Sequence, residues 1–464
     1  MPHASKGVPL TAQVNVTDQV SVIHHGGKAS VTGSCHELKI NGHSLLIDCG
    51  LFQGRDAANR SLDIEFNTGH IQALVLTHAH IDHIGRLPWL VAAGFQGPIY
   101  CTHATAHLVP LMLDDGLKLQ LGLTRQQRVR ILERIKRQLR PVDYATWVPV
   151  KARRQGYFTY LRFSPAGHIL GSAYVEIKLP NHEIAVFSGD LGPKNTPLLP
   201  DPQPPKRADY LFIESTYGNK QHESVHARSE RLLTVITKSL KNGGAIIIPA
   251  FSVGRTQELL YDIESLLHQR QLSQSLPIII DSPMATKITT AYRQYRKLWT
   301  SEAKNKRNAG RYPLNFSQCV VIDSHKAHGA LVNRLASTGE PAIVIAASGM
   351  CMGGRVMDYL QALLPDARSD VIFTGYQAKG TLGRSLQKGD TGVWIENEKV
   401  TVQASIHTMS GYSAHADQRD LLEFIIGCKS HLKQLHLIHG DKRSKDALVE
   451  QIAPHLAPSA IIFN

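Results

Sequence analysis

The chain has 464 residues, of which 42% are hydrophobic, and it carries a formal net charge of +13 at pH 7. This length predicts about two domains with sizeable cores, and the lack of any apolar run near the ~20 residues that span a bilayer excludes transmembrane helices. A basic surface attracts polyanions, above all nucleic acid, although a generally solvated surface would account for the charge equally well.

The six cysteines are spread through the chain without a C-x-x-C pair. This spacing argues against a disulfide framework or a cysteine-ligated zinc site, and it favours a reducing compartment. The first residues also lack the charged-then-apolar layout of a secretion signal. We therefore expect a cytoplasmic protein with no membrane partner.

Residues 1–50 predict short strands, and the last of them, an apolar run from Leu45, ends in Asp48 and a glycine turn. A carboxylate at the end of a strand is usually a turn or cap residue. It can also orient a metal-bound histidine or a water molecule, so Asp48 is a candidate for that role.

The most informative stretch directly follows the apolar run 73–76. His78, His80, Asp82 and His83 lie there within six residues, in the pattern H-x-H-x-D-H. Neutral imidazole and carboxylate groups are the ligands that zinc binds at about 2 Å. Because so many polar groups beside a core are costly unless something satisfies them, this stretch predicts a metal site.

Residues 104–140 predict helices, and their last part is strongly basic. Seven cations stand there against Glu133 alone: Arg125, Arg128, Arg130, Arg134, Lys136, Arg137 and Arg140. The predicted packed stripe is Val129, Leu132, Ile135 and Leu139, which leaves the cations on the exposed face. Such a face fits the tracking of nucleic-acid phosphates, and it fits a merely solvated helix equally well.

Metal-type side chains also follow several later apolar strands. They are His168, Asp190, Glu214, His415 and His439. Each alone is consistent with an ordinary turn residue, but together they repeat the pattern of Asp48 and His78, and open sheets gather chemistry along one strand edge. Between about 225 and 347, alternating helices and apolar strands, including a helix over 284–303, predict a second lobe with a parallel sheet.

In this order, the landmarks resemble the metallo-β-lactamase superfamily and, within it, the β-CASP branch of nucleic-acid nucleases. The matching positions are Asp48, the motif at 78–83, His168, Asp190, Glu214, the Ser-Ala-His motif ending at His415, and His439-Gly. Segments 251–257, 281–285, 347–350 and 374–382 resemble the inserted lobe of that branch. The resemblance covers nearly the whole chain.

The resemblance implies an α/β fold: a four-layer αβ/βα metallo-β-lactamase sandwich with an inserted β-CASP α/β lobe. The sandwich would be made from residues 1–216 and 391–464, and the lobe from residues 217–390.

The resemblance also implies two Zn²⁺ per chain, with Mn²⁺ compatible with the same ligand types. His78, His80 and His168 would hold one ion, Asp82, His83 and His439 the other, and Asp190 would bridge both. Such a pair lowers the pKa of a shared water and clamps the oxygens of a displacement at phosphorus. The resemblance implies a catalytic role for Asp82 as well.

For catalysis, the resemblance implies that His415 protonates the departing ribose oxygen while Glu214 orients it. Asp48 would be the supporting carboxylate. Ser413 and the turn around Gly349 would hold substrate phosphates, with Ser252 and Arg255 as further candidates from the lobe.

The function implied is a zinc-dependent ribonuclease acting on single-stranded RNA, with endo- and exonucleolytic modes both open and a homodimer also open. A histidine at the position of His415 is typical of the RNA enzymes, whereas the DNA-repair members have valine there. One alternative is a small-molecule hydrolase of the lactamase or glyoxalase type, which the inserted lobe and the basic charge disfavour. Another is a non-catalytic RNA-binding subunit, which the complete ligand set disfavours.

Overall fold

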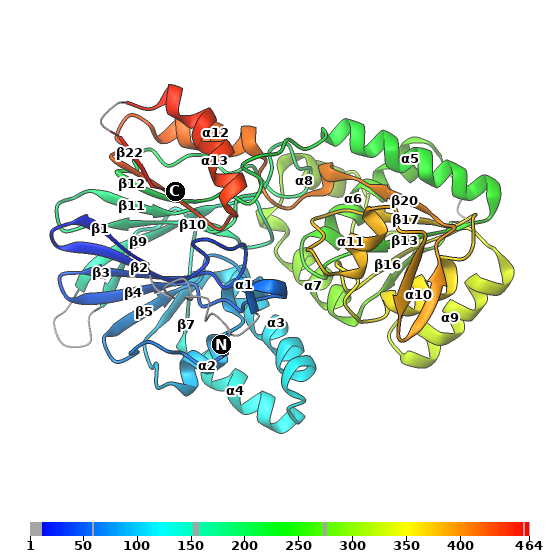
Figure 1. Cartoon of the computed structure of the whole chain (residues 1–464), viewed down its shortest axis with the longest axis horizontal. Helices are drawn as coiled ribbons and strands as arrows, with labels where there is room; N and C mark the ends of the chain where they lie inside the picture. Colours follow the sequence, from blue (N-terminus) through cyan, green and yellow to red (C-terminus); the bar gives the residue numbers. More distant parts are fainter. Residues whose placement is uncertain (1–11, 58–59, 152–156, 272–275, 458–459, 464) are drawn as a thin grey trace, which may run out of the picture. The chain divides into compact units, whose positions relative to one another are not determined.

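The computed structural model describes residues 12–57, 60–151, 157–271, 276–457 and 460–463, and it divides the chain into two compact units (Figure 1). The first unit comprises residues 1–194, 201–221 and 415–464, and the second comprises residues 195–200 and 222–414. The predicted divisions at 216/217 and 390/391 differ from these limits. No described helix has the length and apolar character needed to cross a membrane.

The first unit is built on a pair of seven-stranded sheets within its described residues. One sheet runs, in spatial order, β1 (Ala12–Thr17), β2 (Val20–Gly26), β3 (Cys35–Ile40), β4 (His43–Ile47), β5 (Ile71–Val75), β6 (Ile99–Thr102) and β7 (Leu139–Val142). The other runs β22 (Ile461–Phe463), β21 (Gln434–Ile438), β12 (Tyr210–Glu214), β11 (Ile184–Phe187), β10 (Ala173–Lys178), β9 (Tyr157–Pro165) and β8 (Val148–Lys151). Strands from both ends of the chain thus belong to the first unit, β1 in one sheet and β22 in the other.

Alternating side chains of β12 show how the layers are held together. Tyr210 and Phe212 point into the core between the two sheets, where side chains of β2, β3 and β4 also lie. Leu211 and Ile213 point the other way, into a core that is shared with α12 (Gln418–Cys428) and α13 (Lys442–Ile452). Because successive strand residues face opposite sides, one strand serves both cores.

The remaining outer layer covers the first sheet. It consists of α1 (Ile81–Ile84), α2 (Leu87–Ala92), α3 (His103–Leu121) and α4 (Arg125–Gln138), of which α3 packs on β6 and β7. Helix, sheet, sheet and helix layers therefore follow one another, and the predicted α/β fold is confirmed.

His436 sits in the core between the sheets, where its ring stacks on Phe212 and Phe463 at centroid distances of 4.3 and 4.6 Å. Burial, together with the charge of Lys28, lowers the pKa of His436 to about 3. The unfolded chain binds this proton near pH 6.5, so acidification across this window favours unfolding.

His436→Phe is therefore expected to flatten the loss of stability in acid. Between about pH 6 and 4, the free energy of unfolding of the metal-free variant should fall less steeply than that of the unchanged protein. The two slopes should differ by up to about 1.4 kcal/mol per pH unit. Urea titrations across this range measure the slope. The exposed His431 supplies the control, because His431→Phe removes a histidine that is not in the core. Equal slopes for both variants would contradict the prediction.

The second unit contains a six-stranded sheet in which every pairing is parallel. Its spatial order is β15 (Cys319–Val321), β14 (Ile278–Asp281), β16 (Ala342–Ala346), β13 (Ala245–Pro249), β17 (Asp370–Phe373) and β20 (Ser405–Thr408). Helices alternate with these strands: α5 (Val225–Asn242), α6 (Arg255–Gln269), α7 (Pro283–Gln294), α8 (Ser301–Asn308), α9 (His325–Thr338), α10 (Val356–Leu363) and α11 (Leu382–Gln387).

Two details of this unit differ from the sequence-based prediction. The helix predicted over 284–303 is broken, since α7 ends at Gln294 and the Thr300 side chain caps α8 by accepting a hydrogen bond from the Ala303 amide. The hairpin of β18 (Gly392–Ile395) and β19 (Glu398–Thr401) leads into β20, which pairs with β17. Residues up to 414 therefore belong to this unit.

Candidate metal centre

The H-x-H-x-D-H stretch forms the turn between β5 and α1. His80 is the extended residue before the helix, and Asp82 and His83 lie in its first turn. The segment after β4 packs against this turn, since Cys49 N–H donates to the His83 carbonyl at 2.8 Å. The approach is so close that a Cβ at Gly50 would clash with the Asp82 carbonyl. Only glycine fits there, so the segment after β4 packs directly on the ligand-bearing turn.

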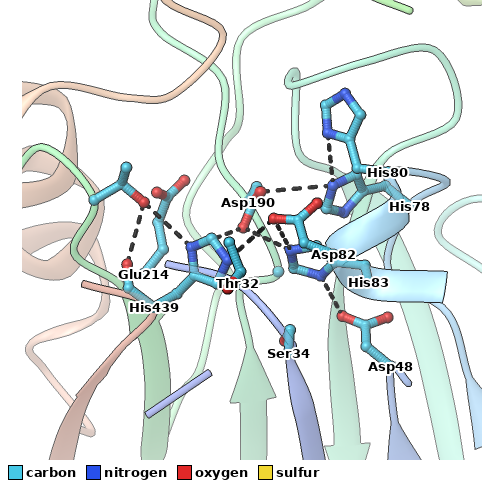
Figure 2. Close-up of polar contacts among 12 residues, drawn as sticks. Thr32, Ser34, Asp48, His78, His80, Asp82, His83, Asp190, Glu214 and His439 are labelled. Atoms are coloured by element: carbon cyan, nitrogen blue, oxygen red, sulfur yellow. Dashed lines mark hydrogen bonds and ion pairs between the residues drawn. The ribbon is translucent and has the colours of Figure 1, made fainter. Parts of the chain in front are cut away.

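The first group of metal-type side chains consists of His78, His80, His168 and Asp190, with one ligand atom from each within 4.8 Å of the others. Nδ1 of His80 lies 3.1 Å from Nε2 of His78 and 2.9 Å from Nε2 of His168. Asp190 Oδ2 lies 3.5 Å from the His78 nitrogen (Figure 2). Three ring nitrogens and one carboxylate oxygen thus converge on one point.

The second group consists of Asp82, His83, Asp190 and His439. Nε2 of His83 lies 3.3 Å from Asp190 Oδ1, and Nε2 of His439 lies 3.6 Å from Asp82 Oδ2 (Figure 2). Asp190 is therefore shared, with Oδ2 facing the first group and Oδ1 facing the second.

Orphaned polar atoms mark the same place. Among the described residues, Nε2 of His83, Nε2 of His439 and Oδ1 of Asp190 are buried without a hydrogen-bond partner. Buried polar groups are nearly always satisfied, so these atoms need a partner outside the chain. Nitrogen and oxygen donors at these separations suit a cation such as zinc, and the residues form a metal site.

The protonation states of His78, His80 and Asp190 favour metal binding, whereas the charges of Asp190 and Asp48 outweigh burial and raise the pKa of His83. Burial and the charge of His83 hold the pKa of His78 well below its ordinary value, and burial lowers the pKa of His80 to about 4. Burial alone would raise the pKa of Asp190, but the charges of His439, His83 and His415 outweigh it and hold the pKa well below its usual range. Neutral imidazole and ionised carboxylate are the forms that bind metals.

Asp48 contacts the metal centre through the ring of His83. Its Oδ2 lies 2.7 Å from His83 Nδ1 (Figure 2). The carboxylate also accepts hydrogen bonds from the Thr77 amide and from the Thr77 hydroxyl, at 2.8 Å each. The hydrogen bond at Nδ1 leaves Nε2 of His83 facing Asp190. Asp48 thus acts on the site through His83.

Two threonines that the sequence analysis missed contact ligand histidines of the metal centre. The Thr77 hydroxyl lies 3.1 Å from His78 Nδ1, and the Thr216 hydroxyl lies 3.2 Å from His439 Nδ1. Thr77 directly precedes His78, and Thr216 follows Glu214 by two residues. Their positions beside metal-type residues were the signal that could have indicated them, because such ligands are usually held by a second hydrogen bond.

His415 and Glu214 form a third group with Asp190. Nδ1 of His415 lies 3.0 Å from Glu214 Oε2 and 3.9 Å from Asp190 Oδ2. Glu214 is fully buried, and its Oε1 accepts a hydrogen bond from the Leu191 amide at 2.6 Å. Burial would lower the pKa of His415, but the charges of Glu214 and Asp190 raise it to about 9. The imidazole therefore carries its proton at neutral pH.

The four residues predicted to hold substrate belong to the second unit. There Arg255 pairs with Glu258 at 3.3 Å, and the hydroxyls of Ser252 and Ser282 lie 3.3 Å apart. The Gly349 carbonyl accepts from Gln377, and the Ser413 amide donates to the Ser410 carbonyl. Their role in substrate binding stays a prediction.

Three family models match the chain. The metallo-beta-lactamase superfamily matches residues 31–233, the Beta-Casp domain residues 256–386, and the Zn-dependent metallo-hydrolase RNA specificity domain residues 399–456. Among solved structures, a protein of unknown function from Enterococcus faecalis V583 shares the fold, with a TM-score of 0.54 at 12% identity over 96% of this chain and 98% of that one.

Curated relatives are similar over most of this chain. Ribonuclease TTHA0252 of Thermus thermophilus is 35% identical over 436 residues, which cover 93% of this chain and 96% of the relative. The transcription termination factors FttA of Methanosarcina mazei and Methanocaldococcus jannaschii are 30% and 31% identical over 92% and 90% of this chain. The matches cover 67% and 66% of these two longer proteins.

Proposed function

The chain belongs to the β-CASP branch of the metallo-β-lactamase superfamily, and from that premise we propose that it is a zinc-dependent ribonuclease that hydrolyses phosphodiester bonds of single-stranded RNA. The observation that carries this proposal is the position of Asp190, which is shared by two groups of metal-type donors and lies beside the protonated His415. The name of the Thermus relative and the RNA specificity model support RNA as the substrate.

We assign two Zn²⁺ per chain to these donors. His78, His80 and His168 would hold one ion, Asp82, His83 and His439 the other, and Asp190 both. When bound, such a pair supplies Lewis acidity that activates water and stabilises the charge on the reacting phosphate. Mn²⁺ is compatible with the same donors.

The residues of the chain divide the remaining work. His415 donates its proton to the 3′-oxygen of the departing ribose, while Glu214 accepts the hydrogen bond from Nδ1 and fixes the orientation of the ring. Cleavage on this side of the phosphorus leaves a 3′-hydroxyl on one product and a 5′-phosphate on the other. Asp48 keeps His83 aligned throughout.

The proposed cellular setting is a cytoplasm. All six cysteines are free, and five of them are buried. Free thiols in this number suit a reducing compartment, where nascent and mature transcripts are available as substrates.

The proposal is tested with zinc-loaded protein and three labelled substrates: a single-stranded RNA, a DNA of the same sequence and a chromogenic lactam. We expect cleavage of the RNA, its loss on addition of a chelator, and its return when zinc is restored. Elemental analysis should find two zinc ions per chain, and RNA fragments should carry 5′-phosphates. Lactam turnover without RNA cleavage would favour a small-molecule hydrolase, and tight RNA binding without cleavage would favour a binding subunit.

A further inference from the structure

Helix α4 shows two different faces. It begins after a capping box formed by Thr124 and Gln127, and it buries Leu132 and Ile135 against the rest of the first unit. Arg128 turns toward α3, where its Nε donates to Asp114 at 2.7 Å. Val129, predicted to be packed, is 49% exposed instead. The inner face is therefore occupied by apolar packing and one structural ion pair.

The outer face carries Arg130, Arg134 and Arg137, which we call the arginine ladder. All three side chains are exposed, and none forms an ion pair within the described part of the chain. The one acid of α4, Glu133, forms its ion pair with Lys136 at 2.9 Å, and the charge of Arg137 acts on it only as a smaller influence. The positions i, i+4 and i+7 share one face of a helix, so the ladder is a row of uncompensated positive charge.

Such a row is unfavourable for the helix by itself, because like charges at i, i+4 repel. The ladder therefore suits a partner that brings negative charge. The helical rise places its members about 6 and 4.5 Å apart along the axis, a spacing that suits a chain of closely spaced phosphates.

The composition of α4 indicates which kind of anionic partner fits the arginine ladder. The ladder lies on a helix whose apolar face is buried against the protein, so no free apolar face is left to enter a lipid surface. Helix α4 contains no aromatic residue on which a base could stack. Contacts to phosphates without stacking predict binding that is independent of base sequence.

The helix is also attached to the ligand-bearing turn of the metal centre. Helix α3 packs on both α1 and α4 (Figure 1). A Cβ added at Gly116 of α3 would lie 3.8 Å from the Ile81 side chain. Helix α1 in turn carries Asp82 and His83. The ladder and the metal centre thus belong to one packed unit.

We propose that the arginine ladder is an accessory binding surface for the phosphate backbone of single-stranded RNA, outside the metal centre. This inference rests on the proposed function for its substrate, because the RNA that is held there would be the RNA presented for cleavage. The surface would raise the affinity for long RNA without taking part in the chemical step.

The test combines Arg130→Gln, Arg134→Gln and Arg137→Gln in one ladder variant. Glutamine is a good helix former, and removing like charges should leave the helix at least as stable. A matched control replaces Lys178, Lys206 and Lys429 by glutamine, which removes the same charge from exposed sites elsewhere in the unit. Both sets are made in the His80→Ala background, so that binding is measured without cleavage.

Fluorescence anisotropy with a 30-nucleotide single-stranded RNA at several salt concentrations gives the result. We expect the ladder variant to bind the RNA at least roughly tenfold more weakly at 0.1 M salt. The magnitude of the slope of log K against log salt should decrease by about 2, since each of the three phosphate contacts contributes about 0.7. The control should change neither quantity by as much, and changing the RNA sequence should leave the loss unaltered.

In the zinc-loaded protein without His80→Ala, the ladder variant should raise KM for long RNA and leave kcat near its original value. Equal RNA affinities and equal salt slopes for the ladder variant and the control would overturn the inference. So would a ladder variant that binds vesicles of anionic lipid more weakly but binds RNA as tightly as the control does. Absence of cleavage by the unchanged protein would count against the proposed function alone, because the binding measurement does not depend on it.

Discussion

Asp190→Asn is expected to remove metal binding and RNA cleavage together. Asp190 is 1% exposed, and its two oxygens lie 3.5 and 3.3 Å from the ring nitrogens of His78 and His83, one in each donor group. An amide keeps the shape of the side chain but loses the negative charge that balances two cations and the surrounding histidines. Because a bound metal supplies several kcal/mol of transition-state stabilisation, we expect kcat to fall by roughly a thousandfold or more.

The measurement pairs elemental analysis with single-turnover cleavage of labelled RNA. Asp209→Asn is the matched control, since Asp209 is also buried but pairs with Arg207 outside the metal centre. The control should retain zinc and activity. An Asp190→Asn protein that keeps two zinc ions per chain and cleaves RNA at the original rate would show that the shared carboxylate has been assigned the wrong role.

Much of the metal centre could be predicted because its residues follow apolar strands. His78 and Asp190 each come three residues after a strand, β5 and β11 respectively, and His439 comes directly after β21. Strand ends that meet at one edge of a sheet bring such side chains together from distant parts of the sequence. The structure gathers these residues, with His168, into the two groups of donors.

Other features could not be predicted, because their cause lies in packing. The exposed Val129 fits the helical apolar spacing, but the Arg128–Asp114 pair and the buried Leu132 and Ile135 set the inner face without it. Strand β20 has the sequence Ser-Ile-His-Thr and lies half-buried at a sheet edge, so it has no apolar run to mark it. The predicted lobe therefore ends at residue 390, whereas the second unit extends to residue 414.

The hydrogen bonds that hold the ligands are a third case. Apart from their positions beside His78 and Glu214 in the sequence, Thr77 and Thr216 resemble the many threonines that serve as caps or strand residues. Only the folded chain shows that their hydroxyls lie beside Nδ1 of His78 and of His439. Spacing within the sequence therefore indicates which groups bind the metal more readily than which groups orient them.

His415→Ala is expected to slow RNA cleavage while leaving the metal centre intact. His415 lies 3.0 Å from Glu214, and the charges of Glu214 and Asp190 raise its pKa, which favours the protonated imidazole. Because positioned general acids contribute typically about 10²- to 10⁴-fold, we expect kcat for RNA to fall within that range. Zinc content should stay at the level of the unchanged protein, since His415 belongs to neither of the two groups of donors that are proposed to bind the zinc ions.

A second substrate separates the acid role from a structural one. Bis(4-nitrophenyl) phosphate has a leaving group that departs as the anion and needs no proton, so its hydrolysis by His415→Ala should stay within a few-fold of the original rate. Glu214→Gln keeps an acceptor beside Nδ1 without its charge, and it should lose roughly 10- to 100-fold on RNA, as is usual for a residue that orients another. If His415→Ala slows both substrates equally, or loses zinc, the histidine supports the site and does not donate the proton. A loss confined to RNA, graded from Glu214→Gln to His415→Ala, is what proton transfer to the ribose oxygen requires.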